Sequence, residues 1–219
     1  MSDTIAIAID GPAGAGKSTI AKQIAAKLNY IYVDTGAMYR AMALFLLRQK
    51  VRPEETEKIS TLCEEADITI RYENGEQVVL LNGENVNGLI RTEEVGNMAS
   101  GSSVNPKVRE KLVKLQQALA REENVVMDGR DIGTCVLPDA KVKVYLTAGV
   151  SVRARRRFDE LTARGEPCSL SEIEADIRER DHKDMTREIS PLRQAEDAVL
   201  IDTSDMTIDQ AVDAVIDLC

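Results

Sequence analysis

The sequence predicts an α/β fold in which helices flank a five-stranded parallel sheet, and three observations support this prediction. Short apolar runs alternate with amphipathic stretches of helical length along most of the chain. A glycine-rich loop at residues 11–18 joins the first apolar run to the first of these stretches. The chain has only two Phe and no Trp, so Ala, Val, Ile and Leu must fill the interior, as in parallel sheets that are buried on both faces.

Five apolar runs are predicted to form the parallel sheet: residues 5–9, 30–33, 125–127, 142–146 and 199–201. Seven stretches are predicted to be helices: 17–28, 36–49, 54–66, 106–122, 151–163, 171–188 and 207–218. Helices between short strands indicate right-handed crossover connections, and the 219 residues are expected to form a single domain.

Four of the predicted strands lead into polar clusters. These clusters are Asp10-Gly11, Asp34-Thr35-Gly36, Asp128-Gly129-Arg130-Asp131 and Asp202-Thr203. Because the carboxyl ends of parallel strands line the ligand crevice of an open α/β sheet, we expect the four clusters to face one another.

Residues 67–90 interrupt the alternation of strands and helices. Residues 67–72 and 77–81 alternate as strands, and Asn74-Gly75 between them is typical of a hairpin turn. Asn82-Gly83 indicates a second turn, and residues 84–86 are a candidate third strand. This segment is therefore predicted to be a small antiparallel insertion in the α/β chain.

The glycine-rich loop matches the phosphate-binding pattern G-x-x-x-x-G-K-[ST] without a mismatch, between a strand and a helix. Glycines let backbone N–H groups surround phosphate oxygens, and the helix N-terminus adds partial positive charge. We expect Lys17 to act catalytically by reaching the β- and γ-phosphates. The predicted ATP-binding residues are Gly11, Pro12, Ala13, Gly14, Ala15, Gly16, Lys17, Ser18 and Thr19.

Ser18 and Asp128 are predicted to hold the cofactor Mg²⁺, with Asp128 acting through water. Asp128 ends an apolar strand, so the alternative is that it only caps the following segment. Arg130, which lies between Asp128 and Asp131, favours a site for a polar, anionic ligand.

Arg40 lies about one helical turn inside the predicted helix 36–49, where its guanidinium could grip a phosphate with two hydrogen bonds. An isolated arginine at this position would more often be a surface residue. The phosphate-binding loop nearby favours a second phosphoryl site, and hence a kinase for a small phosphorylated acceptor. Such a reaction needs no catalytic base, because positioning and charge neutralisation supply the rate.

Residues 151–187 are predicted to be a closing helical lid. A basic run at 153–157 and a charged cluster at 178–187 lie on either side of Gly165. Lids in phosphoryl transfer supply cations and exclude water, whereas the alternative is a solvated helix face. The spacing of Arg180, Asp184 and Arg187 predicts that they share one helical face.

Composition excludes several classes of function. The net charge of −9 disfavours binding to nucleic acid or to an anionic membrane. The four Cys are far apart and there is only one His, so a zinc site is not expected. Reduced thiols, a first apolar run of only five residues and no run of membrane-spanning length predict a cytoplasmic protein without a signal peptide. His182 is expected to face solvent.

Taken together, the motifs closely resemble bacterial cytidylate kinases over nearly the whole chain. The resemblance rests on residues 9–19, 34–40, 90–95, 128–134 and 179–181. The phosphate-binding loop is generic, whereas the Asp-Gly-Arg-Asp-Ile-Gly-Thr block, the Ile-Arg-Thr segment and the antiparallel insertion are distinctive.

The resemblance implies ATP as the donor, CMP or dCMP as the acceptor, and a set of acceptor-binding residues. The implied CMP-binding residues are Thr35, Arg40, Ser100, Arg109, Arg130, Asp131, Arg180, Asp184 and Arg187. Among them Arg40, Arg130 and Arg187 would hold the phosphate, Ser100, Arg109 and Asp131 would contact cytosine, and Arg180 and Asp184 would contact the ribose. Arg130, Arg156 and Arg157 are the further expected catalytic residues, the last two as lid arginines.

The assignment to the base also has a chemical reason. The N4 amino group of cytosine donates a hydrogen bond that the carboxylate of Asp131 accepts. Uracil has a carbonyl oxygen at this position and would leave the carboxylate facing an acceptor, which costs a few kcal/mol in a buried site.

Three alternative functions agree less well with the sequence. Another small kinase, for AMP, dTMP or shikimate, is disfavoured by the insertion and by Asp131. A non-enzymatic nucleotide switch would need a guanine-recognising N-K-x-D segment, and none occurs. A nucleic-acid-binding ATPase is disfavoured by the acidic charge.

The predicted division of the chain has three parts. A core comprises residues 1–36, 123–150 and 188–219, an acceptor-binding region spans about 37–122, and the lid spans about 151–187. The protein is expected to be a monomer.

Overall fold

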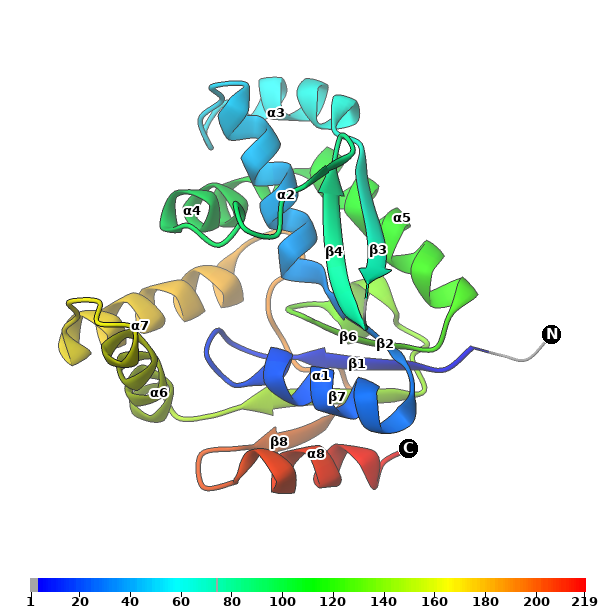
Figure 1. Cartoon of the computed structure of the whole chain (residues 1–219), viewed down its shortest axis with the longest axis vertical. Helices are drawn as coiled ribbons and strands as arrows, with labels where there is room; N and C mark the ends of the chain where they lie inside the picture. Colours follow the sequence, from blue (N-terminus) through cyan, green and yellow to red (C-terminus); the bar gives the residue numbers. More distant parts are fainter. Residues whose placement is uncertain (1–3, 74) are drawn as a thin grey trace.

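The structure, a computed structural model, describes residues 4–73 and 75–219 (Figure 1). A five-stranded sheet has the order β2-β6-β1-β7-β8, and every neighbouring pair is parallel. Its strands are β1 (Ala6–Asp10), β2 (Ile31–Asp34), β6 (Val125–Gly129), β7 (Val142–Thr147) and β8 (Val199–Asp202). The predicted fold class is confirmed, and each predicted strand is present within two residues of its expected ends.

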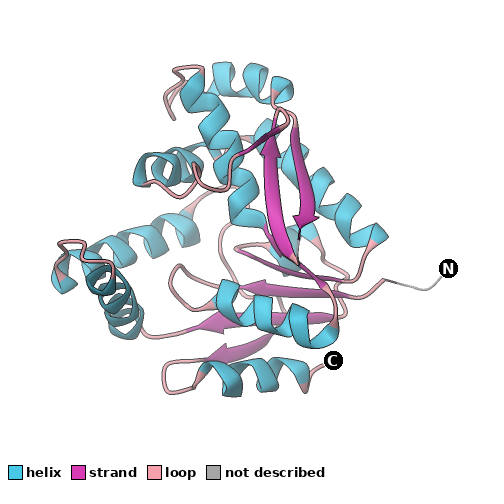
Figure 2. Ribbon diagram, viewed as in Figure 1, coloured by secondary structure: helices cyan, strands magenta, loops and turns pink. Residues whose placement is uncertain are grey.

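Helices cover both faces of this sheet (Figure 2). The α-helices of the described residues are α1 (Lys17–Leu28), α2 (Thr35–Arg48), α3 (Thr56–Leu62), α4 (Glu93–Ser102), α5 (Pro106–Glu122), α6 (Val150–Ala163), α7 (Leu170–Thr186) and α8 (Ile208–Ile216). The seven predicted helices are present, although the stretch predicted as helix 54–66 is α3 followed by a 3-10 turn, Cys63–Glu65.

The two faces of the sheet carry separate hydrophobic cores because side chains alternate along each strand. Ile7 and Ile9 pack with α1 and α8, through residues such as Ile24 and Val212. Ala8, on the opposite face of the same strand, belongs to the larger core that α2 and α5 form. The central strands are therefore buried on both sides, as their apolar sequences predict.

The insertion forms a second, antiparallel sheet in the order β3-β4-β5. Its strands are β3 (Ile68–Glu73), β4 (Glu76–Leu81) and β5 (Glu84–Asn85). Asn82 and Gly83 both have positive φ, 50° and 82°, as a tight hairpin turn requires. In the first predicted turn Gly75 has a φ of 79°, and Asn74 lies outside the described residues.

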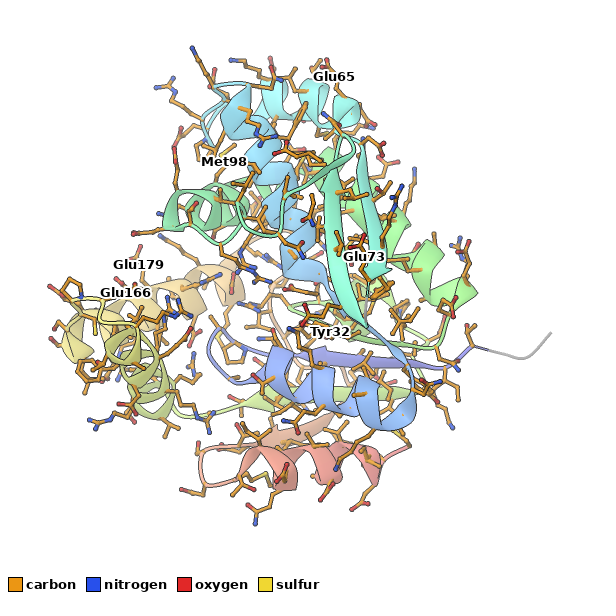
Figure 3. The ribbon with its side chains drawn as sticks, in the orientation of Figure 1. Tyr32, Glu65, Glu73, Met98, Glu166 and Glu179 are labelled. Carbon is orange, nitrogen blue, oxygen red and sulfur yellow. The ribbon has the colours of Figure 1, made fainter. Side chains whose placement is uncertain are left out.

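The antiparallel sheet contacts strand β2 through side chains. The Gln77 side chain accepts a hydrogen bond from the backbone N–H of Asp34 and donates one to its carbonyl, at 2.7 and 3.2 Å. The Tyr72 hydroxyl donates to the carbonyl of Tyr32 at 3.1 Å. Figure 3 shows Tyr32 below the end of this hairpin, close to the parallel sheet. Edge strand β2 is thus partly covered by the insertion, which limits pairing with another chain.

Helix α4 was not expected from the sequence. Its interior contains Gly and Ser, which are weak helix formers. Gly101 explains part of this composition, because a Cβ atom there would lie 2.6 Å from the Cβ of Pro53. The Thr92 side chain caps the helix by accepting from the N–H of Val95 at 3.3 Å. Close packing therefore overrides helix propensity in this segment.

Helices α6 and α7 form a hairpin that projects to one side of the molecule (Figure 1). A small core of Ala154, Ile173 and Ile177 holds the two helices together. The predicted break at Gly165 is confirmed, because this residue has a φ of 72° and lies between the two helices.

Helix α7 ends earlier than predicted, and this corrects one expectation. Arg187 has a ψ of 142° just beyond the helix, so it does not continue the helical face of Arg180 and Asp184. The Thr186 hydroxyl donates back to the carbonyl of His182, and the N–H of Leu192 donates to the carbonyl of Asp184. These bonds turn the chain at the helix end.

Within the described ranges, no helix is both long and apolar enough to cross a bilayer.

Candidate active site

The phosphate-binding loop has the backbone shape that its glycines predict. Gly11 has a φ of 150°, and a Cβ atom there would lie 1.9 Å from the carbonyl oxygen of Leu146. Gly16 occupies the N-cap of α1 in the left-handed conformation and has no side chain to cap the helix. The first N–H groups of α1 can therefore donate hydrogen bonds to a bound anion.

Lys17 is buried at the start of α1, and its ammonium group donates to the carbonyl of Pro12 at 2.7 Å. The pKa of Lys17 is lowered to about 7, mainly by burial and also by the nearby guanidinium of Arg130. Asp128 and Asp10 act in the opposite direction. A phosphate beside this group would favour its charged form.

Ser18, Asp128 and Tyr32 form a hydrogen-bonded chain. The carboxylate of Asp128 accepts from the Ser18 hydroxyl at 2.9 Å and from the Tyr32 hydroxyl at 2.8 Å. Burial and the neighbouring charge of Asp34 raise the pKa of Asp128. Hydroxyl and carboxylate oxygens suit Mg²⁺. The described ranges contain no group of three metal-binding carboxylate, Cys or His side chains, so phosphate and water oxygens must complete such a site.

The polar clusters at the ends of the strands face one another, as predicted. The Asp10 carboxylate accepts from the N–H groups of Ile132 and Gly133, both at 2.8 Å. The Thr35 hydroxyl donates to the carbonyl of Asp128 at 2.7 Å, and that of Thr203 contacts the carbonyl of Ala15 at 3.4 Å. Backbone and side-chain bonds thus connect the ends of β1, β2, β6 and β8.

Asp131 and Arg109, two residues predicted to contact the base, form a buried ion pair with each side chain only 8% exposed. Arg109 also donates to the Tyr39 hydroxyl at 3.3 Å. Burial disfavours the charged form of Arg109. The interactions with Tyr39 and Asp131 outweigh this effect, so the pKa of Arg109 is raised. Helices α2 and α5 therefore meet at Asp131, which follows β6.

Three predicted acceptor-site arginines lie close together. Burial lowers the pKa of Arg180, and the charges of Arg130 and Arg40 lower it further. Burial, Arg91 and Arg130 likewise lower the pKa of Arg40, although Asp34 acts against them. Arg130 is oriented by Asp184, whose carboxylate accepts from its Nε at 2.7 Å. In the described part of the chain, neither Arg40 nor Arg180 has a salt bridge.

The other predicted residues are placed around this cluster. Burial lowers the pKa of Arg187, although the charges of Asp131 and Asp184 act against this shift. The Nε of Arg187 donates to the carbonyl of Ser190 at 2.7 Å. Ser100 is an exposed residue of α4.

The two predicted lid arginines are held differently. Arg156 donates to the carbonyl of Thr203 at 2.7 Å, beside the phosphate-binding loop. Arg157 is half-exposed and pairs with Glu160 of its own helix at 2.8 Å. The hydrogen-bond partners of both residues, Thr203 and Glu160, lie outside the arginine cluster.

Several side chains that shape the site were not singled out from the sequence. Tyr32 and Tyr39 hydrogen-bond Asp128 and Arg109, and Arg91 pairs with Asp34 at 2.7 Å. Arg153 was assigned only to the basic run, but it is buried. Its spacing from Val150 and Ala154 on the inward face of α6 is the signal that could have identified it.

Comparisons with known proteins agree with this geometry. Residues 7–219 match the family model described as cytidylate kinase. A cytidylate kinase from Caldicellulosiruptor saccharolyticus is 51% identical over 98% of this chain and 95% of its own length. Another from Geobacillus sp. is 48% identical over 100% of this chain and 97% of its own, and one from Listeria innocua is 48% identical over the same shares. With a family model and relatives that cover nearly all of its length, the chain belongs to the cytidylate kinase family.

Proposed function

We propose that the protein transfers the γ-phosphoryl group of ATP to CMP or dCMP, giving ADP and CDP or dCDP. The observation that carries this proposal is the arginine cluster of Arg40, Arg130 and Arg180, close to the buried pair of Arg109 and Asp131. Guanidinium groups repel one another unless an anion neutralises them, so this cluster suits the phosphate of a nucleotide. The neighbouring carboxylate of Asp131 suits the base of the same nucleotide.

The donor side depends on the phosphate-binding loop. N–H groups at the start of α1 and the ammonium of Lys17 stabilise the negative charge of the β- and γ-phosphates. Ser18 and Asp128 would hold Mg²⁺, Asp128 through water. The ion, when bound, neutralises phosphate charge, while Tyr32 keeps the Asp128 carboxylate oriented.

On the acceptor side, we assign phosphate binding to Arg40, Arg130 and Arg187. Asp184 holds Arg130 in place by accepting from the Nε of Arg130, and one terminal nitrogen of Arg130 donates to the carbonyl of Gly129 at 3.4 Å. The other terminal nitrogen is left to a phosphate. Arg180 and Asp184 are assigned to the ribose. Because the acceptor oxygen already belongs to a phosphate, alignment and charge neutralisation are sufficient for transfer.

Recognition of the base is assigned to Asp131, together with Arg109 and Ser100. Arg109 pairs with the carboxylate of Asp131, whose oxygens accept hydrogen bonds. The N4 amino group of cytosine satisfies such an acceptor, whereas the O4 atom of uracil does not. Discrimination of a few kcal/mol follows from a buried mismatch. The Thr35 hydroxyl donates to the carbonyl of Asp128, and we assign Thr35 to the boundary between the ATP and CMP sites.

We further propose that residues 1–36, 123–150 and 188–219 form the core, that about 37–122 bind the acceptor, and that about 151–187 form the lid with Arg156 and Arg157. The four cysteines are free thiols, which supports a cytoplasmic location. A monomeric state stays a prediction.

The direct test is an assay of ADP release with ATP, Mg²⁺ and each nucleoside monophosphate in turn. We expect turnover with CMP and dCMP to exceed that with AMP, UMP or dTMP by at least a hundredfold. Turnover of AMP or dTMP without turnover of CMP would contradict the proposal.

A further inference from the structure

Arg153, near the start of α6, is the most completely bonded arginine near the candidate site. Its side chain is 4% exposed, and that of Asp181 on α7 is 12% exposed. Its two terminal nitrogens donate to the two carboxylate oxygens of Asp181 at 3.1 and 2.6 Å. Its Nε donates to the carbonyl of Ala148 at 2.8 Å. The guanidinium is thus fixed by the last turn before α6 and by α7 together.

The same guanidinium also holds the phosphate-binding loop. One terminal nitrogen donates to the carbonyl oxygen of Ala13 at 2.9 Å. A Cβ atom at Gly14 would lie 3.4 Å from the Cβ of Arg153, so the loop and the arginine are in close contact. Residues 140 positions apart in the chain are therefore connected directly at the tip of the loop.

This bond controls the direction of a hydrogen-bond donor. In a planar trans peptide the C=O and the following N–H point in opposite directions. When Arg153 holds the carbonyl of Ala13, the N–H of Gly14 must point away from Arg153. An N–H group that is fixed in this way is available to a phosphate without reorganisation when the nucleotide binds.

Two of the three remaining arginines of the basic run make contacts only within α6, whereas Arg156 donates to the carbonyl of Thr203 at 2.7 Å. Arg155 pairs with Asp159 at 3.2 Å and Arg157 with Glu160 at 2.8 Å, and all four side chains are at least 46% exposed. Both members of each pair belong to α6. Figure 3 shows Glu166 and Glu179 on the outer part of the α6–α7 hairpin, away from the parallel sheet.

We propose that Arg153 and Asp181 are a positioning pair that presets the phosphate-binding loop for the donor nucleotide and forms the fixed base of the α6–α7 hairpin. Closure over the substrates is then confined to the part of the hairpin beyond this pair and beyond the bond from Arg156 to Thr203, about residues 157–180. Neither residue contacts the nucleotide. The inference rests on the proposed function in that the loop binds the donor nucleotide, but it does not depend on which acceptor is used.

Binding of ADP alone tests the positioning role by calorimetry, with CMP binding measured separately. Arg153→Lys keeps the positive charge but cannot reach three separate acceptors. Arg153→Met combined with Asp181→Leu removes both charges and leaves no buried ion unpaired. We expect both variants to bind ADP at least tenfold more weakly and to bind CMP within threefold of the wild type.

Ile177→Ala is the matched control. It loosens the packing between α6 and α7 at Ala154 and Ile173 without touching the guanidinium. We expect it to lower the melting temperature while it leaves ADP binding within threefold. Equal weakening of ADP binding by Ile177→Ala and by the Arg153 variants would show that the pair is merely structural. Wild-type ADP affinity in Arg153→Lys would overturn the proposal even if the double variant did not fold.

Hydrogen exchange tests the fixed base. Amides of residues 152–154 should be protected to the same extent with and without ADP and CMP, whereas those of 158–178 should gain protection when both bind. Equally fast exchange of both segments in the free protein would overturn the proposal. Failure of the wild type to bind ADP would instead refute the proposed kinase function, so the two failures are distinguishable.

Discussion

The Ser18 hydroxyl donates to the Asp128 carboxylate at 2.9 Å, across 110 positions of the chain. Ser18 lies in the first turn of α1 after the phosphate-binding loop, and Asp128 lies in strand β6 beside the central strand β1. The bond places the two predicted Mg²⁺-binding groups together at the carboxyl edge of the sheet. Tyr32, which holds the other oxygen of Asp128, is the first residue to test.

Tyr32→Phe should weaken binding of Mg²⁺ without disturbing the fold. The change removes the hydroxyl that orients Asp128 at 2.8 Å and keeps the ring. Loss of such a supporting bond costs about tenfold or more in metal affinity. We expect the Mg²⁺ concentration for half-maximal activity to rise by about this factor. Tyr30→Phe is the control, because the Tyr30 hydroxyl makes no hydrogen bond in the described part of the chain. The same Mg²⁺ dependence in both variants would refute the role of Tyr32.

Lys17→Met should reduce kcat by at least about a hundredfold, or about 3 kcal/mol, because it removes the charge nearest the β- and γ-phosphates. The melting temperature should not fall, since burial already disfavours the ammonium and lowers its pKa to about 7. The exposed Lys27 of the same helix provides the control variant Lys27→Met, for which kcat should stay unchanged. Near-wild-type kcat in Lys17→Met would show that the loop assignment is wrong.

Asp131→Ala should affect both stability and CMP binding. The structure explains why, because removal of Asp131 leaves Arg109 buried without its partner, a change that costs about 3 kcal/mol or more. Adding Arg109→Met should restore the melting temperature but not the KM for CMP. The KM for ATP should stay within threefold throughout. Recovery of CMP affinity together with stability would indicate that Asp131 is only structural.

Gln77→Ala should raise the KM for CMP severalfold and leave the KM for ATP unchanged. Its amide makes two hydrogen bonds to the backbone of Asp34, the residue that caps α2 and pairs with Arg91. Loss of these bonds should destabilise the protein by about 1 kcal/mol. Thr69→Ala, at an exposed position of the same antiparallel sheet, is the control. A KM for CMP equal in the two variants would show that the insertion does not position the acceptor site through Gln77.

Asp10 should give the free energy of unfolding a distinctive pH dependence. Burial raises its pKa to about 6 from 3.8, although the N–H groups of Gly133 and Ile132 oppose the shift. The folded state therefore binds a proton more tightly than the unfolded state between these values. This contribution to stability is complete below pH about 4 and is lost as the pH rises through about 6, amounting to roughly 3 kcal/mol.

Denaturant unfolding of the wild type and Asp10→Asn across pH 4 to 7 measures this contribution as a difference. The free energy of unfolding of the wild type should fall relative to that of the variant as the pH rises. A constant difference over the whole range would mean that the pKa of Asp10 is not raised.

Sequence patterns were sufficient to predict the fold class, all five parallel strands, seven helices, the insertion and the phosphate-binding loop. These features depend on local properties: apolar periodicity, glycine at positions of positive φ, and turn residues such as Asn82 and Gly83. Their signals are contained within about ten to twenty consecutive residues. Motif resemblance identified the family for the same reason, because each motif is a short, continuous segment.

Features that depend on residues far apart in the chain became visible only in the folded structure. Helix α4 is stabilised by packing of its small residues, which overrides their weak propensity. Arg187 lies outside α7 because hydrogen bonds from Thr186 and Leu192 turn the chain there. Arg153 stands in a run of similar arginines, and only the carbonyl of Ala13 and the carboxylate of Asp181 distinguish it. Burial and pairing are properties of the folded surroundings, so identical residue types in one run take different roles.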